Sequence, residues 1–423
     1  MGLYTIHDNP TVDQQIRCQI NEIVGILTRN FPEIHSIILT GGFGKGEGSV
    51  KIFDGMVKPL RDFDIVVILK KPVSRKNVEM VKRLLVNDTN QTGNYKYAQE
   101  FCIDLTVGTL NTINLFPDIT TYDMKNSKVI YGKDIRQLIR WEAKDIPLRS
   151  GARLLFQKST ALIGAFSLDY IEKDVPKNLL SVFMRETSKV YVEIGGALCI
   201  LAGKYDSHCL KRVEILKEIY EQTFPNLFSL IPNLVEKIDL ASKHKVNPTD
   251  YPIGQDPVDY WFTARDDLCN VIKYYLNEYL HFSAVDLIEF VCLLEKNLSK
   301  EYYAPLIDNY LSTKNLVKLK FFLRQINYAY NIKQNIDYSM LSLRNQKFSV
   351  SLLKGFSAPC IKLFSACLLT LCSIERTGTA DRAVLNEALK RLSFLKLNDK
   401  TFDNNWEEAR SKCLKLIDMV QIL

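Results

Sequence analysis

Two aspartates stand at a spacing that could hold a divalent cation. Asp62 and Asp64 flank Phe63 and come directly before the apolar run 65–69. Side chains in a strand alternate between its two faces, so we expect both carboxylates to project from one face. Neighbouring carboxylates repel each other unless a cation lies between them. Mg²⁺ is the expected ion, because it prefers oxygen ligands and leaves positions for substrate phosphates.

A third carboxylate, Asp104, is the only charge in residues 101–111, a segment that reads as a half or fully buried strand. An aspartate is rarely buried without a partner. Backbone amides or a lysine could satisfy Asp104, or it could complete a metal site with Asp62 and Asp64. A DxD at the exposed start of a strand is common without any metal. The apolar strand behind this pair and the third carboxylate favour the metal site.

A glycine-rich segment, "LTGGFGKGEGSV", precedes these aspartates at residues 39–50. The Walker pattern fails, because Glu47 stands where a lysine is required, and the dinucleotide pattern GxGxxG fails as well. An isolated glycine cluster could simply supply positive φ angles in a loop. Here the glycines lie between one predicted strand and the DxD pair. We therefore predict that Gly41 and Gly42 let a phosphate approach backbone N–H groups that no β-carbon shields.

The order of these motifs resembles the polymerase-beta-like nucleotidyltransferase superfamily. The matching residues are Gly41 with Gly42, then Asp62 with Asp64, then Asp104 on a later strand. "VIYGKDI" at 129–135 is similar to a turn that often closes these domains, and "KVYVEIGGALCILAGKY" at 189–205 is similar to the first helix after the catalytic domain of aminoglycoside-type members. The resemblance covers about the first 150 residues well and the remainder loosely.

The resemblance implies a two-metal transfer of a nucleotide. Asp62 and Asp64 would hold one Mg²⁺ at the β- and γ-phosphates, and a second Mg²⁺ shared with Asp104 would polarise the acceptor hydroxyl. Asp104 is the candidate general base. Gly42 stands where the family more often has a serine, which removes a hydroxyl that would contact a phosphate. Lys45 or Ser49 could supply that contact instead, and Lys45, Lys189 and Arg61 are candidates for neutralising the triphosphate.

The predicted elements give an α+β fold with two regions. A helix over 9–34, strands at 34–40, 62–69 and 100–110, and a helix over 74–88 form a small mixed-sheet domain at residues 1–150. From 151 to 423 long amphipathic segments replace the strands. We expect an all-helical region there, in one bundle or in two bundles at 151–300 and 301–423.

The composition bounds the class of protein. The chain has 423 residues, 47% hydrophobic content and a net charge of +7, which is ordinary for a folded protein and suits phosphorylated ligands without specifying nucleic acid. Its ten cysteines form no CxxC pair, so we expect free thiols in a reducing cytoplasm. The longest apolar run, at 361–374, is too short to cross a membrane and reads as a buried helix.

The motifs leave two functional hypotheses. The first is an Mg²⁺-dependent nucleotidyltransferase that moves a nucleoside monophosphate from an NTP to a hydroxyl and releases pyrophosphate. Its acceptor is open: a small molecule, a tRNA or RNA end, or a protein side chain. A toxin–antitoxin style enzyme is a specific version of this hypothesis. The second is a nucleotide-binding sensor or scaffold with the same fold and no turnover. The three intact aspartates favour the first, and the absence of kinase signatures disfavours a phosphotransferase.

Overall fold

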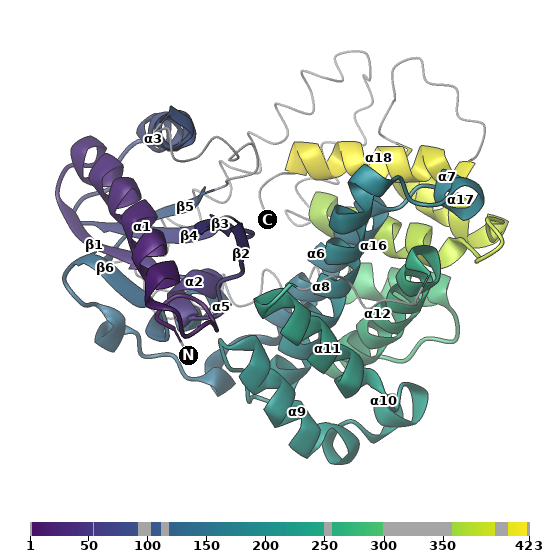
Figure 1. The fold of residues 1–423 in the computed structure, drawn as a ribbon. Coiled ribbons are helices and arrows are strands. Elements are labelled where there is room, and N and C mark those ends of the chain that lie inside the picture. Colours follow the sequence, from purple (N-terminus) through teal and green to yellow (C-terminus); the bar gives the residue numbers. More distant parts are fainter. Residues whose placement is uncertain are drawn as a thin grey trace. The chain divides into compact units, whose positions relative to one another are not determined.

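The computed structural model describes residues 2–53, 55–91, 103–110, 118–248, 256–298, 358–393 and 405–420 (Figure 1). The chain divides into two units, each formed by two stretches of sequence. Met1–Gly151 joins Gly195–Ile253 in the first unit, and Ala152–Ile194 joins Gly254–Leu423 in the second. The two units are described separately below.

A four-stranded mixed sheet forms the centre of the first unit. Its order is β5-β4-β1-β6. Strand β4 is parallel to β5, whereas β1 is antiparallel to both β4 and β6. The small mixed sheet that the sequence predicts is therefore confirmed. The strands are β1 (Ile34–Leu39), β4 (Phe63–Leu69), β5 (Ile103–Thr109) and β6 (Lys128–Gly132).

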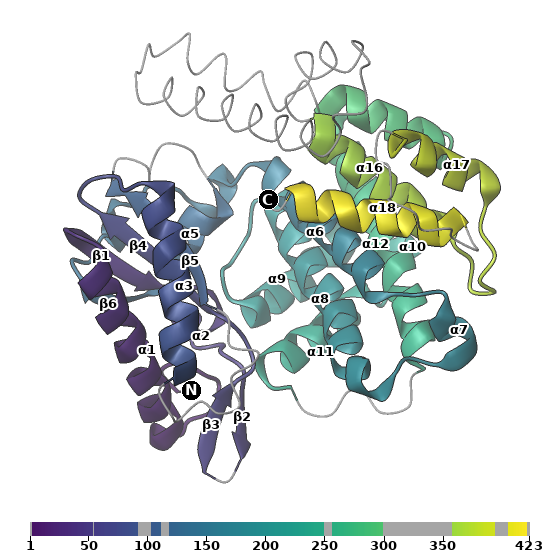
Figure 2. The ribbon, with the colours of Figure 1, turned by 90° about the horizontal axis from the view of Figure 1, so that it is seen from above.

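Alternating residues of this sheet enter two different cores. Ile65, Val67 and Leu69 of β4 pack with the buried faces of α1 (Pro10–Asn30) and α3 (Arg75–Gln91) (Figure 2). Val66 and Ile68 of the same strand pack on the opposite face, with residues of α5 (Ile119–Lys125) and of the segment after β6. The period of two in the sequence thus assigns each side chain to one face.

Two segments differ from the predicted loops. The glycine segment forms a short helix, α2 (Gly41–Lys45), which ends at Gly46 in the left-handed conformation, with φ at 82°. Residues after it form a hairpin of β2 (Val50–Phe53) and β3 (Met56–Pro59). This hairpin occupies the stretch between the glycines and the DxD pair, where we predicted only a loop, and it projects from the domain (Figure 2).

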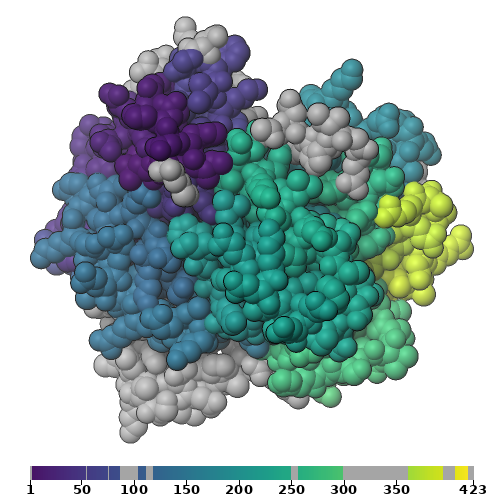
Figure 3. Space-filling model, turned by 60° about the horizontal axis from the view of Figure 1, so that its bottom comes forward, coloured from purple at the N-terminus to yellow at the C-terminus, as the bar shows by residue number. Residues whose placement is uncertain are grey.

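Helices from the middle of the chain complete the first unit. They are α9 (Cys209–Thr223), α10 (Pro225–Leu230) and α11 (Leu234–Val246). Their surface adjoins that of residues 119–150 in the space-filling view (Figure 3). The first stretch of this unit ends at Gly151, and residues 195–253 belong to the same unit.

The second unit is mostly helical in its described residues, with one isolated bridge between Ile374 and Ala380. Trp261 stacks on Phe166 with ring centroids 4.0 Å apart, and Trp406 meets the same ring edge-on at 5.8 Å. Both tryptophans are fully buried, and their indole N–H groups donate to backbone carbonyls. The helices are most of α6 (Leu148–Ala165) and of α8 (Lys177–Leu201), and all of α7 (Asp169–Lys173), α12 (Pro257–Leu280), α16 (Ala358–Ser373), α17 (Arg382–Arg391) and α18 (Asn405–Val420), with residues 287–298 also helical. Residues 148–151 of α6 and 195–201 of α8 belong to the first unit.

The predicted buried helix at 361–374 corresponds to α16, whose apolar side chains are largely enclosed. No helix among the described residues is long and apolar enough to span a bilayer. The cysteines that the structure describes in full are free thiols. The predicted division of the helical region near residue 300 falls at residues outside those that the structure describes.

Candidate functional site

Asp64 and Asp104 are direct neighbours on the two parallel strands. The register of β4 and β5 pairs Phe63 with Ile103 and Asp64 with Asp104. The flanking apolar residues of both strands belong to the core under α1 and α3, so the two carboxylates lie on the opposite face of the sheet. Residues paired across adjacent strands have side chains close enough to interact. The sheet therefore brings together two of the three predicted carboxylates.

The pKa of Asp64 reflects its burial and the nearby carboxylates. Burial and the negative charges of Asp104 and Asp62, in that order, raise the pKa of Asp64 from 3.8 to about 6. The positive charges of Lys45 and Lys245 act in the opposite direction. Among the described residues, no group donates a hydrogen bond to the Asp64 carboxylate. A partly buried carboxylate between two others, without a donor, is a site where a bound cation would be strongly favoured.

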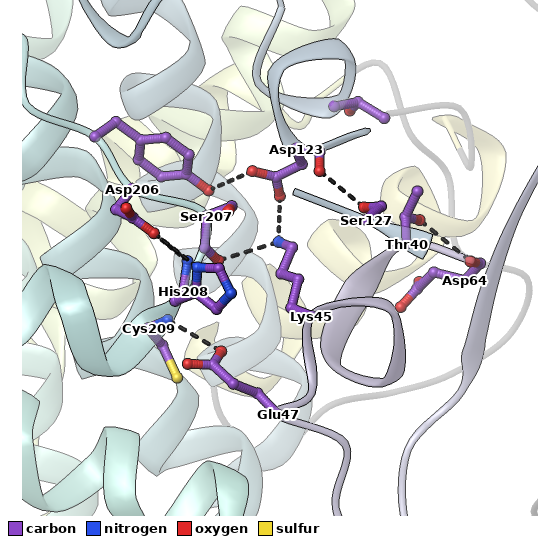
Figure 4. A network of polar contacts seen from close by, with 12 residues as sticks. Thr40, Lys45, Glu47, Asp64, Asp123, Ser127, Asp206, Ser207, His208 and Cys209 are labelled. Carbon is purple, nitrogen blue, oxygen red and sulfur yellow. Dashed lines mark hydrogen bonds and ion pairs between the residues drawn. The ribbon is translucent and has the colours of Figure 1, made fainter. Parts of the chain in front are cut away.

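Gly41 lies against the Asp64 side chain. A β-carbon at position 41 would overlap Asp64 Oδ2, and the residue has a φ of 60°. The preceding residue, Thr40, donates both its backbone N–H and its hydroxyl to the Asp64 carbonyl, at 2.8 and 3.2 Å (Figure 4). Position 41 therefore requires glycine both for its backbone conformation and for its close approach to the carboxylate.

The other two aspartates are exposed, and Asp104 is more open than the sequence predicted. Asp104 is exposed, although we expected its strand to bury it, because β5 lies at the edge of the sheet. Asp62 is also exposed and precedes β4, which starts at Phe63. The described residues contain no cluster of three or more His, Cys, Asp or Glu already arranged around a metal position. The donor set, three carboxylates with Asp64 repelled by the other two, nevertheless fits a hard divalent cation.

Lys45 is engaged in a buried polar network at the end of α2. Its ammonium group forms an ion pair with Asp123 at 2.6 Å and donates to the Ser207 carbonyl at 3.1 Å (Figure 4). The Lys45 side chain is only 8% exposed. The hydroxyl of Tyr205 donates to the other oxygen of Asp123, and Arg212 donates to that hydroxyl. The network joins α2, α5 and the start of α9.

Glu47, which breaks the Walker pattern, has a structural role that its place in the sequence does not indicate. Its carboxylate accepts the backbone N–H groups of Cys209 at 3.1 Å and Leu210 at 3.4 Å. These groups begin α9, whose N-cap residue His208 gives no side-chain cap. A helix N-terminus leaves its first N–H groups without partners and favours negative charge. Glu47 therefore caps a helix 162 residues further along the chain.

The segment after Glu47 is also bound to the middle of the chain. Ser49 is buried, and its hydroxyl donates to the carbonyl of Lys245 in the last turn of α11. This bond places Lys245 in the same unit as the aspartates, where its charge acts on Asp64. Nothing in the local sequence distinguished Lys245 from a solvated lysine at a helix end. Only the fold reveals it as a cation near the carboxylates.

The remaining predicted site residues have different positions. Gly42 lies in a tight turn: its carbonyl accepts the Glu47 N–H at 2.8 Å, and a β-carbon at position 42 would lie 3.1 Å from the Glu47 carbonyl oxygen. A serine in its place would be crowded. Lys189 lies on α8 in the second unit and pairs with Glu186 at 2.9 Å. The structure thus brings Gly41, Gly42, Lys45, Ser49 and the aspartates into one unit, and Lys189 belongs to the other.

Comparison with family models, with curated proteins and with solved structures gives no match to this chain.

The cap provided by Glu47 can be tested by substitution. We expect Glu47→Ala to lower the free energy of unfolding by about 1–3 kcal/mol, because two N–H groups at the start of α9 lose a buried charged acceptor. Urea denaturation followed by circular dichroism measures this change. Glu218→Ala, an exposed position on the same helix, is the matched control and should change stability by less than about 0.5 kcal/mol. Equal effects of the two substitutions would contradict the cap.

The raised pKa of Asp64, caused first by burial and then by the neighbouring carboxylates, predicts that the stability of the fold depends on pH. Because the pKa of Asp64 is raised in the folded protein, the folded state holds this proton more tightly than the unfolded chain, and stability is lost as the pH rises from about 4 through about 6. Asp64→Asn removes that loss. In buffer with a chelator, we expect the variant to exceed the wild type by about 1–3 kcal/mol at pH 8 and by little at pH 4. Denaturation across this pH range measures the difference.

Asp134 gives a control of opposite sign. A side-chain hydrogen bond from Arg136 lowers the pKa of Asp134 to about 2, so Asp134→Asn removes a group that stabilises the protein at high pH. An Asp64→Asn variant that is no more stable than the wild type at pH 8 would show that burial and the neighbouring carboxylates do not disfavour the ionised Asp64 as the structure indicates.

Proposed function

We propose that this protein is an Mg²⁺-dependent nucleotidyltransferase that moves a nucleoside monophosphate from an NTP to a hydroxyl acceptor and releases pyrophosphate. The observation that carries the proposal is the pairing of Asp64 with Asp104 in the register of β4 and β5. With Asp62 in front of β4 and Gly41 against Asp64, this arrangement agrees with the motif order of the polymerase-beta-like superfamily.

Asp62, Asp64 and Asp104 are the residues that would hold Mg²⁺. Bound there, the metal would neutralise phosphate charge and make the acceptor hydroxyl more acidic. With a pKa of about 6, Asp64 is mostly ionised at neutral pH and so is ready to bind a cation. The positive charges of Lys45 and Lys245 near Asp64 favour an anionic substrate in the same region.

The transfer step is an in-line displacement at the α-phosphorus. The acceptor oxygen forms a new bond to that phosphorus, and the bond between the α-phosphorus and the oxygen bridging to the β-phosphate breaks. The electron pair leaves with pyrophosphate. The exposed carboxylate of Asp104 is the candidate base for the hydroxyl proton, since it is accessible to an acceptor and acts next to Asp64.

The first candidates for contact with the triphosphate are the backbone N–H groups at the start of α2. Gly41 and Gly42 open this helix, and the first N–H groups of a helix lack partners within it. Lys45 and Ser49 remain candidates for phosphate contact, but Asp123 and the Lys245 carbonyl already bind their polar atoms, so either contact requires an exchange of partners. Lys245 is a further candidate, because its charge already acts on Asp64. A reaction that consumes NTP and requires Mg²⁺ is expected in the cytoplasm, where both are supplied.

The reaction can be tested by following label from each α-³²P-labelled NTP, with Mg²⁺ and cell extract as the source of acceptor. We expect labelled RNA, protein or small molecule with the wild type. Asp64→Asn and Asp104→Asn should lower the rate at least about 100-fold, because each removes a ligand that stabilises charge in the transition state.

Asp169→Asn is the matched control, since it removes one exposed carboxylate from α7 in the second unit. It should transfer label at the wild-type rate. Transfer that survives both substitutions on the sheet would place the reaction elsewhere. The absence of transfer, together with the absence of Mg²⁺-dependent NTP binding, would overturn the enzyme and leave a scaffold with this fold.

A further inference from the structure

The hairpin of β2 and β3 packs on the domain through Val50 and Val57 of one face, and Ile52 on the same face is 50% exposed. Val50 and Val57 are 7% and 6% exposed and belong to the core under α1. Gln15 of α1 accepts the Val57 N–H at 2.8 Å and donates to the Gly55 carbonyl at 2.9 Å. Gln19 donates to the Val57 carbonyl at 3.4 Å. These contacts fix the hairpin on α1 and so determine which face is outward.

The outward face carries two lysines and two large apolar side chains. The register pairs Lys51 with Lys58 and Phe53 with Met56, so all four share a face, opposite to that of Val50 and Val57. Phe53 is 59% exposed and Met56 is 47% exposed. Asp54, between the two strands in sequence, lies outside the described residues. We call these four residues, Lys51, Phe53, Met56 and Lys58, the hairpin platform.

The charge on the hairpin platform is unfavourable for the free protein. Two lysines directly opposite each other on an antiparallel pair repel. Neither Lys51 nor Lys58 forms an ion pair with any residue that the structure describes. An anionic ligand lying across both would remove the repulsion, and an exposed phenylalanine next to it offers a stacking surface. Phosphates beside flat rings are the chemistry of single-stranded nucleic acid, in which every base can stack on an aromatic side chain.

The position of the hairpin platform links it to the carboxylates. β3 ends at Pro59, and Asp62 follows after only two intervening residues. Three residues span at most about 11 Å, so the end of the platform at Lys58 lies nearest the DxD pair and the end at Phe53 lies farthest from it. We propose that the hairpin platform binds single-stranded RNA, with phosphates on Lys51 and Lys58 and a base on Phe53. Its role, which rests on the proposed nucleotidyltransferase function, is to hold the acceptor strand whose terminal hydroxyl receives the nucleotide.

Binding is tested first, without NTP and with a chelator, so that the result does not depend on catalysis. Fluorescence anisotropy of a short, labelled, mixed-sequence single-stranded RNA gives the affinity of the full chain across a range of salt concentrations. Lys51→Ala/Lys58→Ala should reduce the slope of log K against log[salt] by about 1.4, for two lost phosphate contacts. Phe53→Ala should weaken binding by about tenfold and leave the slope unchanged. All three side chains are outward, so circular dichroism should show the wild-type fold.

The matched control is Lys70→Ala/Lys71→Ala, which removes the same charge from exposed lysines at the opposite end of β4. It should bind RNA like the wild type. Equal weakening by the two double variants would mean non-specific attraction to positive charge and would overturn the hairpin platform, as would wild-type binding by Phe53→Ala and Lys51→Ala/Lys58→Ala together.

The label-transfer assay separates the two proposals. Asp64-dependent transfer to a protein or a small molecule, with no RNA labelled, would overturn the acceptor role of the hairpin and leave the nucleotidyltransferase standing. RNA binding by the platform with no transfer from any NTP would overturn the nucleotidyltransferase and the acceptor role together. Transfer to RNA, with a higher KM for RNA and an unchanged kcat in Phe53→Ala, is the outcome that we expect.

Discussion

The close approach of Gly41 to Asp64 is the constraint on which the rest of the site depends. The chain leaves β1, turns at Thr40 and passes over the start of β4 so tightly that no β-carbon fits. This corner fixes the direction of α2. It therefore also fixes where Lys45 and Glu47, at and just beyond the end of that helix, meet the rest of the chain. Because only glycine fits at position 41, this corner determines both the surroundings of the Asp64 carboxylate and the docking of distant helices.

That docking depends on the cost of burying charge. Lys45 is 8% exposed and Glu47 is 3% exposed, so each needs a specific partner. Asp123 with the Ser207 carbonyl satisfies the lysine, and the start of α9 satisfies the glutamate. As a result, the unit that contains the carboxylates is built from two stretches of sequence. Lys245 joins the unit through an uncharged contact, the hydrogen bond from the buried Ser49 hydroxyl to its backbone carbonyl.

The hairpin and the DxD pair belong to one continuous stretch between α2 and β4. Its beginning is held by Ser49, its middle by Gln15 and Gln19 of α1, and its end continues into Asp62. Residues fixed at several points along a short stretch hold their positions relative to one another. Substrate groups bound at the hairpin and at the carboxylates would therefore be held in a fixed relation, which is what a transfer between two substrates requires.

The sequence by itself determined the α+β class and the order of α1, β1, β4, α3 and β5 in the N-terminal domain, because each of these elements has its own local periodicity. The sequence did not determine the pairing of Asp64 with Asp104, which depends on the register between β4 and β5. It did not reveal the helical form of α2, the hairpin, the exposure of Asp104 or the partners of Lys45 and Glu47. Glycine-rich and short alternating segments have weak local preferences for helix or strand. A carboxylate that caps a helix 162 residues away belongs to no periodic pattern in the sequence. Only tertiary structure decides such pairings, because the cost of burying a charge appears only when distant segments meet.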